Sequence, residues 1–224
     1  MKLRSSFFVL LLIVTLCSSL LNAKQGFSLR FAYGVESDSD LGEILSLQKP
    51  TDHKYHFDVL ALDVGYLLTP SLFDLPLDLY IKGGTALFQS ENLSKYPELH
   101  QISDINDKNI YEITLYIKLY YTINLKDNIM RIGFGEGGSY VNDYLPAEVI
   151  EAHIKDPQSS AYSKYLNYLD ISFDVDLGHL FGVKTLDETY LGYTIKHRSG
   201  IFGLINNVRH GGSNYNTISI EKNF

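Results

Sequence analysis

The sequence predicts an all-β fold, an eight-stranded antiparallel transmembrane β-barrel with long extracellular loops and short periplasmic turns. The composition is the first observation, because 17 Tyr and 12 Phe against six Pro and no Trp favour aromatic-rich strands over helices. The second is a series of eight segments in which large apolar and polar side chains alternate. The third is that no stretch after residue 23 approaches the roughly 18 apolar residues of a membrane helix, so a membrane-spanning chain must use strands.

The first 23 residues have the features of a cleaved signal peptide, which leaves a single barrel domain over residues 24–224. Lys2 and Arg4 form a basic start, residues 7–16 form an apolar run, and Ala23 offers a small residue for cleavage. The single cysteine, Cys17, lies inside this segment. We therefore expect the exported domain to fold without disulfides.

The first four expected strands place large apolar side chains on one face and small or polar ones on the other. They cover residues 27–35, 60–68, 77–82 and 112–121. The fourth is the clearest, with Ile113, Leu115, Ile117, Leu119 and Tyr121 opposite Glu112, Thr114, Tyr116, Lys118 and Tyr120. Because a membrane barrel turns its apolar side toward lipid, we expect these apolar faces to point outward.

The last four expected strands cover residues 130–135, 169–177, 191–196 and 218–224. The connections between strands alternate between long and short, as in outer-membrane barrels, whose closure removes unpaired strand edges. One long connection contains a short helix over residues 146–153, which Pro146 opens. A glycine-rich stretch over residues 133–138 lies in a barrel strand with no helix after it, so close strand packing explains it better than nucleotide binding.

The inward faces carry charged side chains, which argues against a soluble barrel with a dry ligand cavity such as a lipocalin. We expect these groups to form a paired structural network inside a barrel too narrow for a diffusion pore. The set comprises Glu112, Lys118, Arg131, Asp170, Asp174 and Asp176.

Nucleic-acid, metal and cofactor functions find no support in the sequence. The formal charge of −7, without a basic cluster, excludes a nucleic-acid surface. His53 with His56, and Asp104 with Asp107, lie in polar loops without a recognised ligand spacing. We therefore expect no metal site and no cofactor.

The candidate chemistry lies at the end of the seventh strand. The alternation that sends Leu191, Tyr193 and Ile195 outward also sends His197 and Ser199 outward. Two residues apart on one strand, they are about 6.5–7 Å apart at Cα, so their side chains can meet. An imidazole beside a hydroxyl can act as a general base for a serine nucleophile.

These residues resemble those of the lipid A 3-O-deacylases, the PagL family of eight-stranded outer-membrane barrels. The resemblance rests on His197-x-Ser199 in the penultimate strand, a glycine-containing loop after it, and a last strand that ends in the aromatic Phe224. It implies a serine esterase that removes an ester-linked 3-hydroxyacyl chain from lipid A. Ser199 would then be the nucleophile and His197 the general base, facing lipid.

The sequence departs from that family at two positions. Asn214 stands where the family has a Glu that orients the histidine; an Asn can accept the imidazole N–H but stabilises the charged ring less. Gly200 follows Ser199, where the family has an Asn. The backbone N–H of Gly200 and the side-chain amides of Asn206 and Asn207 are the candidate oxyanion donors.

The resemblance also implies a location and partners. We expect a bacterial outer-membrane protein, embedded next to the lipid A of lipopolysaccharide in the outer leaflet, with Phe224 read by the barrel assembly machinery. The sequence leaves a homodimer open. It also leaves a second function class open, a non-catalytic structural or lipopolysaccharide-binding barrel, in which His197 and Ser199 merely lie among lipid headgroups.

Overall fold

The computed structural model describes residues 26–224, apart from residues 47, 49, 50, 52, 103, 104, 106, 107, 127, 156, 159, 160 and 211. The expected signal peptide with Cys17, and the pair Asp104 and Asp107, lie outside the described residues.

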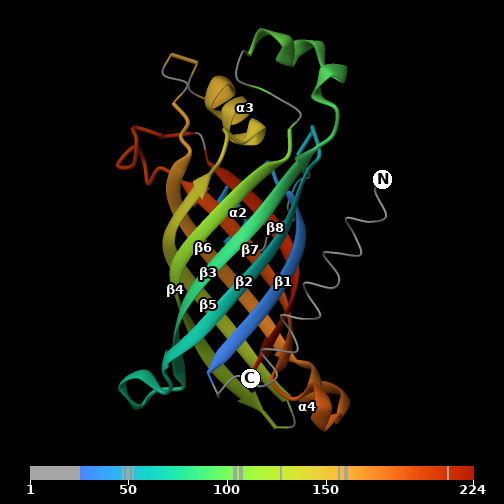
Figure 1. Cartoon of the computed structure of the whole chain (residues 1–224), viewed down its shortest axis with the longest axis vertical. Helices are drawn as coiled ribbons and strands as arrows, with labels where there is room; N and C mark the ends of the chain where they lie inside the picture. The colour runs from blue at the N-terminus through green and yellow to red at the C-terminus, as the bar shows by residue number, and fades with distance from the viewer. Residues whose placement is uncertain are drawn as a thin grey trace.

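The described chain forms a closed barrel of eight strands, each antiparallel to its neighbours, in which the first strand pairs with the last to complete the ring (Figure 1). This confirms the predicted fold. The strands are β1 (Phe27–Glu36), β2 (Phe57–Thr69), β3 (Leu77–Ser90), β4 (Ile110–Leu125), β5 (Asn128–Val141), β6 (Tyr165–Asp176), β7 (Thr189–Ser199) and β8 (Ser213–Asn223).

The ends of several strands differ from the expected ends. β3 and β5 continue to Ser90 and Val141, past the points where the apolar alternation fades. Leu177, expected in the sixth strand, instead begins α4 (Leu177–Phe181). The cause is Asp176, whose side chain accepts a hydrogen bond from the backbone N–H of His179 and so caps the helix.

The barrel turns its apolar side outward, as the alternation predicts. Exposed large side chains on the strands include Phe31, Tyr66, Ile113, Leu115, Phe134, Phe173, Leu191, Ile218 and Ile220. The inner face is buried and charged instead. Within the part of the chain that the structure describes, no helix is long and apolar enough to cross a membrane.

An ion-pair network fills the barrel interior. Arg30 of β1 binds Asp63 of β2 at 3.0 Å and both carboxylate oxygens of Asp170 of β6, and Lys118 of β4 also pairs with Asp170. Gly133 of β5 makes room for the Lys118 side chain, since a Cβ at this position would lie 2.5 Å from Lys118 Cε and from Ser172 Oγ. The predicted inward network is therefore present, and the glycine is needed for close packing.

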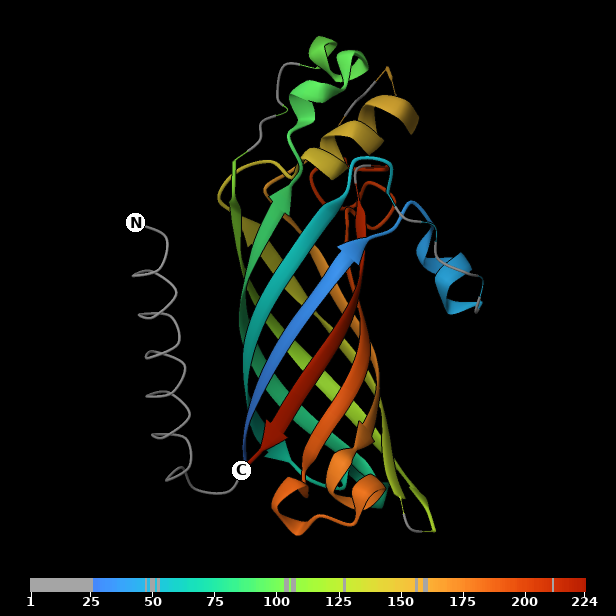
Figure 2. The same cartoon turned by 90° about the vertical axis from the view of Figure 1, so that its right-hand side faces the viewer.

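The connections divide the barrel into two ends (Figure 2). One end, called here the long-loop end, carries four long connections between strands: residues 37–56, 91–109, 142–164 and 200–212. They contain α2 (Leu41–Leu45), η2 (Leu93–Lys95), η3 (Pro97–Gln101) and α3 (Pro146–Lys155). Residues 70–76, 126–127 and 177–188 join strands at the other end and contain η1 (Leu72–Asp74), α4 and η4 (Lys184–Leu186). The connection 177–188 is not a short turn, because it holds α4 and η4.

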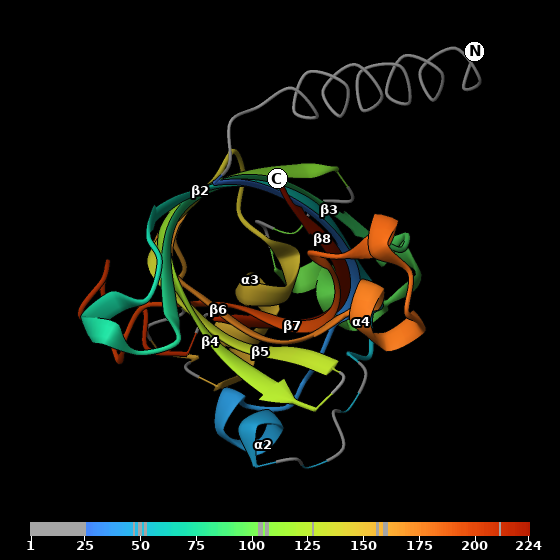
Figure 3. The same ribbon diagram turned by 90° about the horizontal axis from the view of Figure 1, so that it is seen from below.

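α3 lies across the opening of the barrel at the long-loop end, and the view from below shows it within the ring of strands (Figure 3). Its residues Ala147 and Ile150 are buried against Phe57, Phe88 and Tyr215 in the main apolar cluster. The helix predicted at residues 146–153 is thus confirmed. It plugs the mouth of the barrel and packs against the strand ends around it.

Candidate active site

His197 and Ser199 are half-buried on the outer face at the long-loop end of β7. The alternation of β7 sends their neighbours Lys196 and Arg198 inward, where both are buried. The two candidate side chains therefore face the lipid side of the barrel, as the sequence predicts, while the residues between them anchor the strand from within.

The side chain of Asn214 orients His197. The two residues are direct partners across β7 and β8, and His197 Nδ1 lies 2.7 Å from Asn214 Oδ1. Asn214 Nδ2 donates to the backbone carbonyl of Ser39 at 3.0 Å, which turns Oδ1 toward the imidazole. An oxygen can only accept, so Nδ1 carries the proton and Nε2 keeps a free lone pair. That tautomer is the one a general base requires.

Ser199 stands next to this pair without being bonded to it. In the described structure no hydrogen bond joins Ser199 Oγ to His197. A separation of two residues along a strand leaves about 6.5–7 Å between their Cα atoms, which side-chain rotation can bridge. Such contacts are often long in a free enzyme and tighten when substrate binds.

Arg198, between the two candidate residues, ties β7 to α3. Its Nε donates to Glu148 Oε1 at 2.6 Å, and Ser213 Oγ of β8 donates to the same oxygen at 2.9 Å. All three side chains are buried. One carboxylate on the plugging helix thus clamps the ends of both strands that carry His197 and Asn214. Sequence reasoning missed this clamp and the role of Ser39, because neither contact follows from strand alternation.

The loop over residues 200–212 holds the three expected oxyanion donors. At Gly200, a Cβ would come within 2.0 Å of the backbone oxygen of Val208, so glycine lets the loop fold back onto the strand end. Asn206 Nδ2 donates to Ser163 Oγ and to the carbonyl of Tyr165, both at 2.9 Å. These two bonds use both amide hydrogens of Asn206. Asn207 is exposed and has a positive φ of 59°.

A cavity of about 290 Å³ lies on the other side of Asn214, between the loop of residues 37–56 and α3. Carboxylates dominate its wall, in Glu36, Asp38, Asp40 and Glu151. Lys155 of α3 pairs with Asp40 at 3.0 Å and with Glu151 at 2.9 Å. The surplus of carboxylates makes this cavity unsuited to a phosphate group.

No family model and no curated protein matches this sequence. Solved structures do match its fold. The chain is similar to the outer membrane enzyme PagL. The superposition has a TM-score of 0.51 and 11% sequence identity, over 88% of this chain and 99% of that one. Neisserial surface protein A superposes with a TM-score of 0.47 and 10% identity, over 88% of this chain and 96% of that one. At 11% identity, the likeness to PagL concerns the fold.

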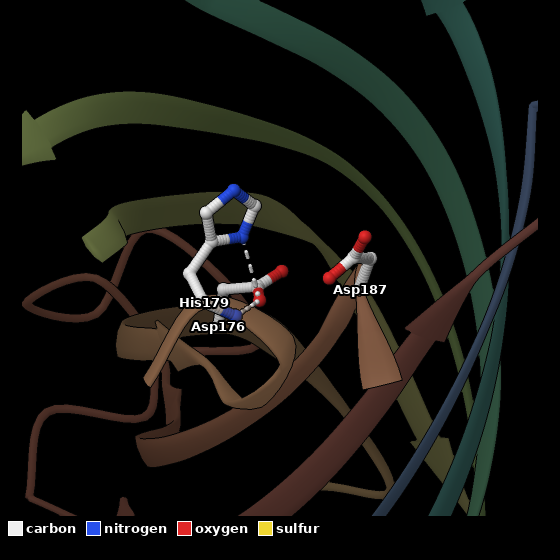
Figure 4. Close-up of side chains that lie close together, drawn as sticks. All are labelled: Asp176, His179 and Asp187. Atoms are coloured by element: carbon white, nitrogen blue, oxygen red, sulfur yellow. Dashed lines mark hydrogen bonds and ion pairs between the residues drawn. The ribbon is translucent and has the colours of Figure 1, made fainter. Parts of the chain in front are cut away.

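A second cluster of potential ligands lies at the end of β6 and in the connection to β7, at the opposite end of the barrel from His197. Potential ligand atoms of Asp176, His179 and Asp187 lie within 4.8 Å of one another (Figure 4). Asp176 already has a structural task there, since its two oxygens accept the backbone N–H groups of His179 and Glu188, both at 2.8 Å. The Asp176 carboxylate, which accepts a hydrogen bond from His179 Nδ1, raises the pKa of His179. Helix capping and turn closure thus account for the positions of Asp176 and His179.

The two loop histidines considered as ligands do not come together as a metal site. His53 is buried; its Nδ1 accepts the backbone N–H of Tyr55 at 3.2 Å, and its Nε2 lies 3.3 Å from Asp38. Burial lowers the pKa of His53. His56 is exposed and adopts a positive φ of 47°. Within the described residues, these contacts give His53 a role in holding its loop.

Proposed function

We propose that this protein is a lipid A 3-O-deacylase-like serine esterase of the bacterial outer membrane. It hydrolyses an ester-linked 3-hydroxyacyl chain of lipopolysaccharide. The observation that carries the proposal is the 2.7 Å contact between His197 Nδ1 and Asn214 Oδ1, on the same outer face as Ser199. A base held in this tautomer on a lipid-facing surface suits an ester whose acyl chains lie in the membrane.

The proposed reaction uses the oriented pair in two steps. His197 Nε2 takes the proton of Ser199 as Oγ attacks the ester carbonyl carbon, and Asn214 Oδ1 accepts the Nδ1–H of the charged ring. The imidazolium then protonates the departing sugar oxygen, which leaves an acyl-serine. Water, deprotonated by the same His197, releases the 3-hydroxy fatty acid and restores Ser199.

The location of the pair supports this substrate class. The resemblance of the His-x-Ser segment and the fold of the outer membrane enzyme PagL both favour an outer-membrane orientation with the long-loop end outside. The two candidate residues then lie at the outer leaflet, where the acyl chains of lipid A begin. Export by the first 23 residues and recognition of Phe224 by the assembly machinery belong to the same proposal.

Mass spectrometry of lipid A tests the proposal. A Gram-negative host whose lipid A carries the 3-O-linked chain produces the native protein or its Ser199→Ala variant, each confirmed as a folded barrel. Loss of one 3-hydroxyacyl mass with the native protein alone is the expected result. Unchanged lipid A in both strains contradicts the deacylase and favours the alternative, a structural or lipopolysaccharide-binding barrel.

A further inference from the structure

Asn167 of β6 is the direct neighbour of Ser199 across the β6–β7 pair. Leu166 and Tyr168 on either side of it are fully buried in the barrel interior, so alternation places Asn167 on the outer face with Ser199. Side chains directly opposite in an antiparallel pair have Cβ atoms about 4.5–5.5 Å apart. The carboxamide of Asn167 therefore lies within reach of a group bound to Ser199 Oγ.

This carboxamide is sheltered and unused. Asn167 is only 8% exposed, although it faces outward. The loop over residues 200–212 is fastened nearby, because Asn206 donates to the carbonyl of Tyr165 on the same strand. Across the described chain, the side chain of Asn167 makes no hydrogen bond. The Nδ2–H groups of Asn167 are therefore free to donate to a group bound at Ser199.

The side-chain amide of Asn206, a candidate donor in the loop after Ser199, is already occupied. Both amide hydrogens of Asn206 are engaged by Ser163 and Tyr165. Donating to a substrate would break one of these bonds and loosen the loop. Asn167, by contrast, can donate without giving up a bond, and it projects from a strand that the barrel holds in place.

We propose that Asn167 is an oxyanion donor of the Ser199 site. This inference rests on the proposed function and assigns a further catalytic residue to it. Oγ of Ser199 bonds to the ester carbon, the carbonyl π pair moves to its oxygen, and Asn167 Nδ2–H donates to that oxyanion. Collapse of the intermediate breaks the bond to the sugar oxygen, which takes the proton held by His197. β8 thus supplies the group that orients the base, and β6 the group that stabilises the charge.

A fluorophosphonate probe tests this role without depending on lipid A. The probe forms a covalent bond to an activated serine and releases fluoride, and its P–O oxygen occupies the oxyanion position. The full-length barrel is purified in detergent as native protein and as the Asn167→Ala, Asn167→Asp, Asn216→Ala and Ser199→Ala variants. Asn216 is the matched control, an outward Asn on β8 whose side chain bonds Tyr193. Heat-dependent gel mobility confirms that each variant is a folded barrel.

The native protein and Asn216→Ala are expected to label at the same rate, and Ser199→Ala not at all. Asn167→Ala should label about 10²-fold more slowly, the usual loss for one oxyanion donor, and Asn167→Asp more slowly still because its carboxylate repels the oxyanion. Native-rate labelling of folded Asn167→Ala overturns the assignment and leaves the esterase standing. Equal slowing in Asn216→Ala also overturns it, since the effect is then not local. Absence of labelling at Ser199 in the native protein overturns the esterase and this inference together.

Discussion

At the residue scale, the candidate site depends on which way one carboxamide faces. Asn214 has no charge to hold His197. The orientation of the Asn214 carboxamide comes from the bond that its Nδ2 donates to the backbone carbonyl of Ser39. A loop carbonyl therefore sets the tautomer of a strand histidine. Where the resembled family uses a carboxylate, which needs no such orientation, this chain needs the loop of residues 37–56.

Substitution of Asn214 separates orientation from charge. Asn214→Ala removes the acceptor for Nδ1–H and should lower the rate of ester hydrolysis by about 10²-fold or more, because the wrong tautomer becomes available. Asn214→Glu restores an acceptor and stabilises the imidazolium, so it should keep or raise the native rate. Hydrolysis of a soluble p-nitrophenyl ester by the purified barrels measures both. Loss of all activity in folded Asn214→Glu would show that Asn214 is not the third residue of the site.

Part of this site can be predicted from the sequence, because side chains alternate regularly between the two faces of a strand. Alternation places His197 and Ser199 outward, and the resemblance to the deacylase family places Asn214 opposite His197. In the structure, Asn214 and His197 are direct partners across β7 and β8. The pairing of Asn167 with Ser199 depends on the register between β6 and β7, across the connection of residues 177–188, which alternation does not determine. Ser39 and Glu148 act from loops, whose tertiary contacts leave no periodic signal.

At the scale of elements, α3 both plugs the barrel and binds the loop beside Asn214. Glu148 clamps Arg198 and Ser213 on one side of the helix. On the other side, Lys155 bridges Glu151 and Asp40 of the neighbouring loop. The helix therefore links the strand ends of the candidate site with the loop that holds Asn214.

Burial of Glu151 on α3 makes the stability of this region depend on pH. Burial raises the pKa of Glu151 from 4.5 to about 7. The pKa of Glu151 is higher in the folded state than in the unfolded state, so protonation of this carboxyl favours folding. The contribution is fully present below about pH 4.5 and is lost as the pH rises through about 7. Glu151→Gln keeps a neutral group at every pH. The variant should therefore gain stability relative to the native protein between pH 4.5 and 8.

Urea midpoints followed by far-UV circular dichroism at pH 4.5, 6 and 8 measure this difference. Glu91→Gln is the control, since Glu91 is an exposed carboxylate at the same end of the barrel with only a 3.9 Å contact to Lys95. Its midpoint should keep a constant offset from the native one. A constant offset for Glu151→Gln as well would mean that burial of this carboxyl has no energetic effect.

At the scale of the whole molecule, the barrel is a solid support rather than a channel. Asp170 receives Arg30 from β1, Lys118 from β4 and the hydroxyl of Tyr168 from its own strand. Lys82 of β3 and Glu221 of β8 form a second bridge at 2.7 Å. These contacts run through the lumen, so strands that are not neighbours in the ring are fastened to each other. A rigid wall of this kind can hold residues on its outer surface in fixed register.

Asp170→Asn tests how much of this rigidity comes from one carboxylate. The variant keeps the shape of the side chain but leaves Arg30 and Lys118 without their shared buried anion, which should cost about 3–5 kcal/mol of unfolding free energy. Asp58→Asn, at a half-buried carboxyl on β2, should cost less than about 1 kcal/mol. Urea unfolding in detergent micelles measures both. If Asp170→Asn unfolds at the native midpoint, the strands are held by backbone pairing alone, and the inner charges serve only to fill the lumen.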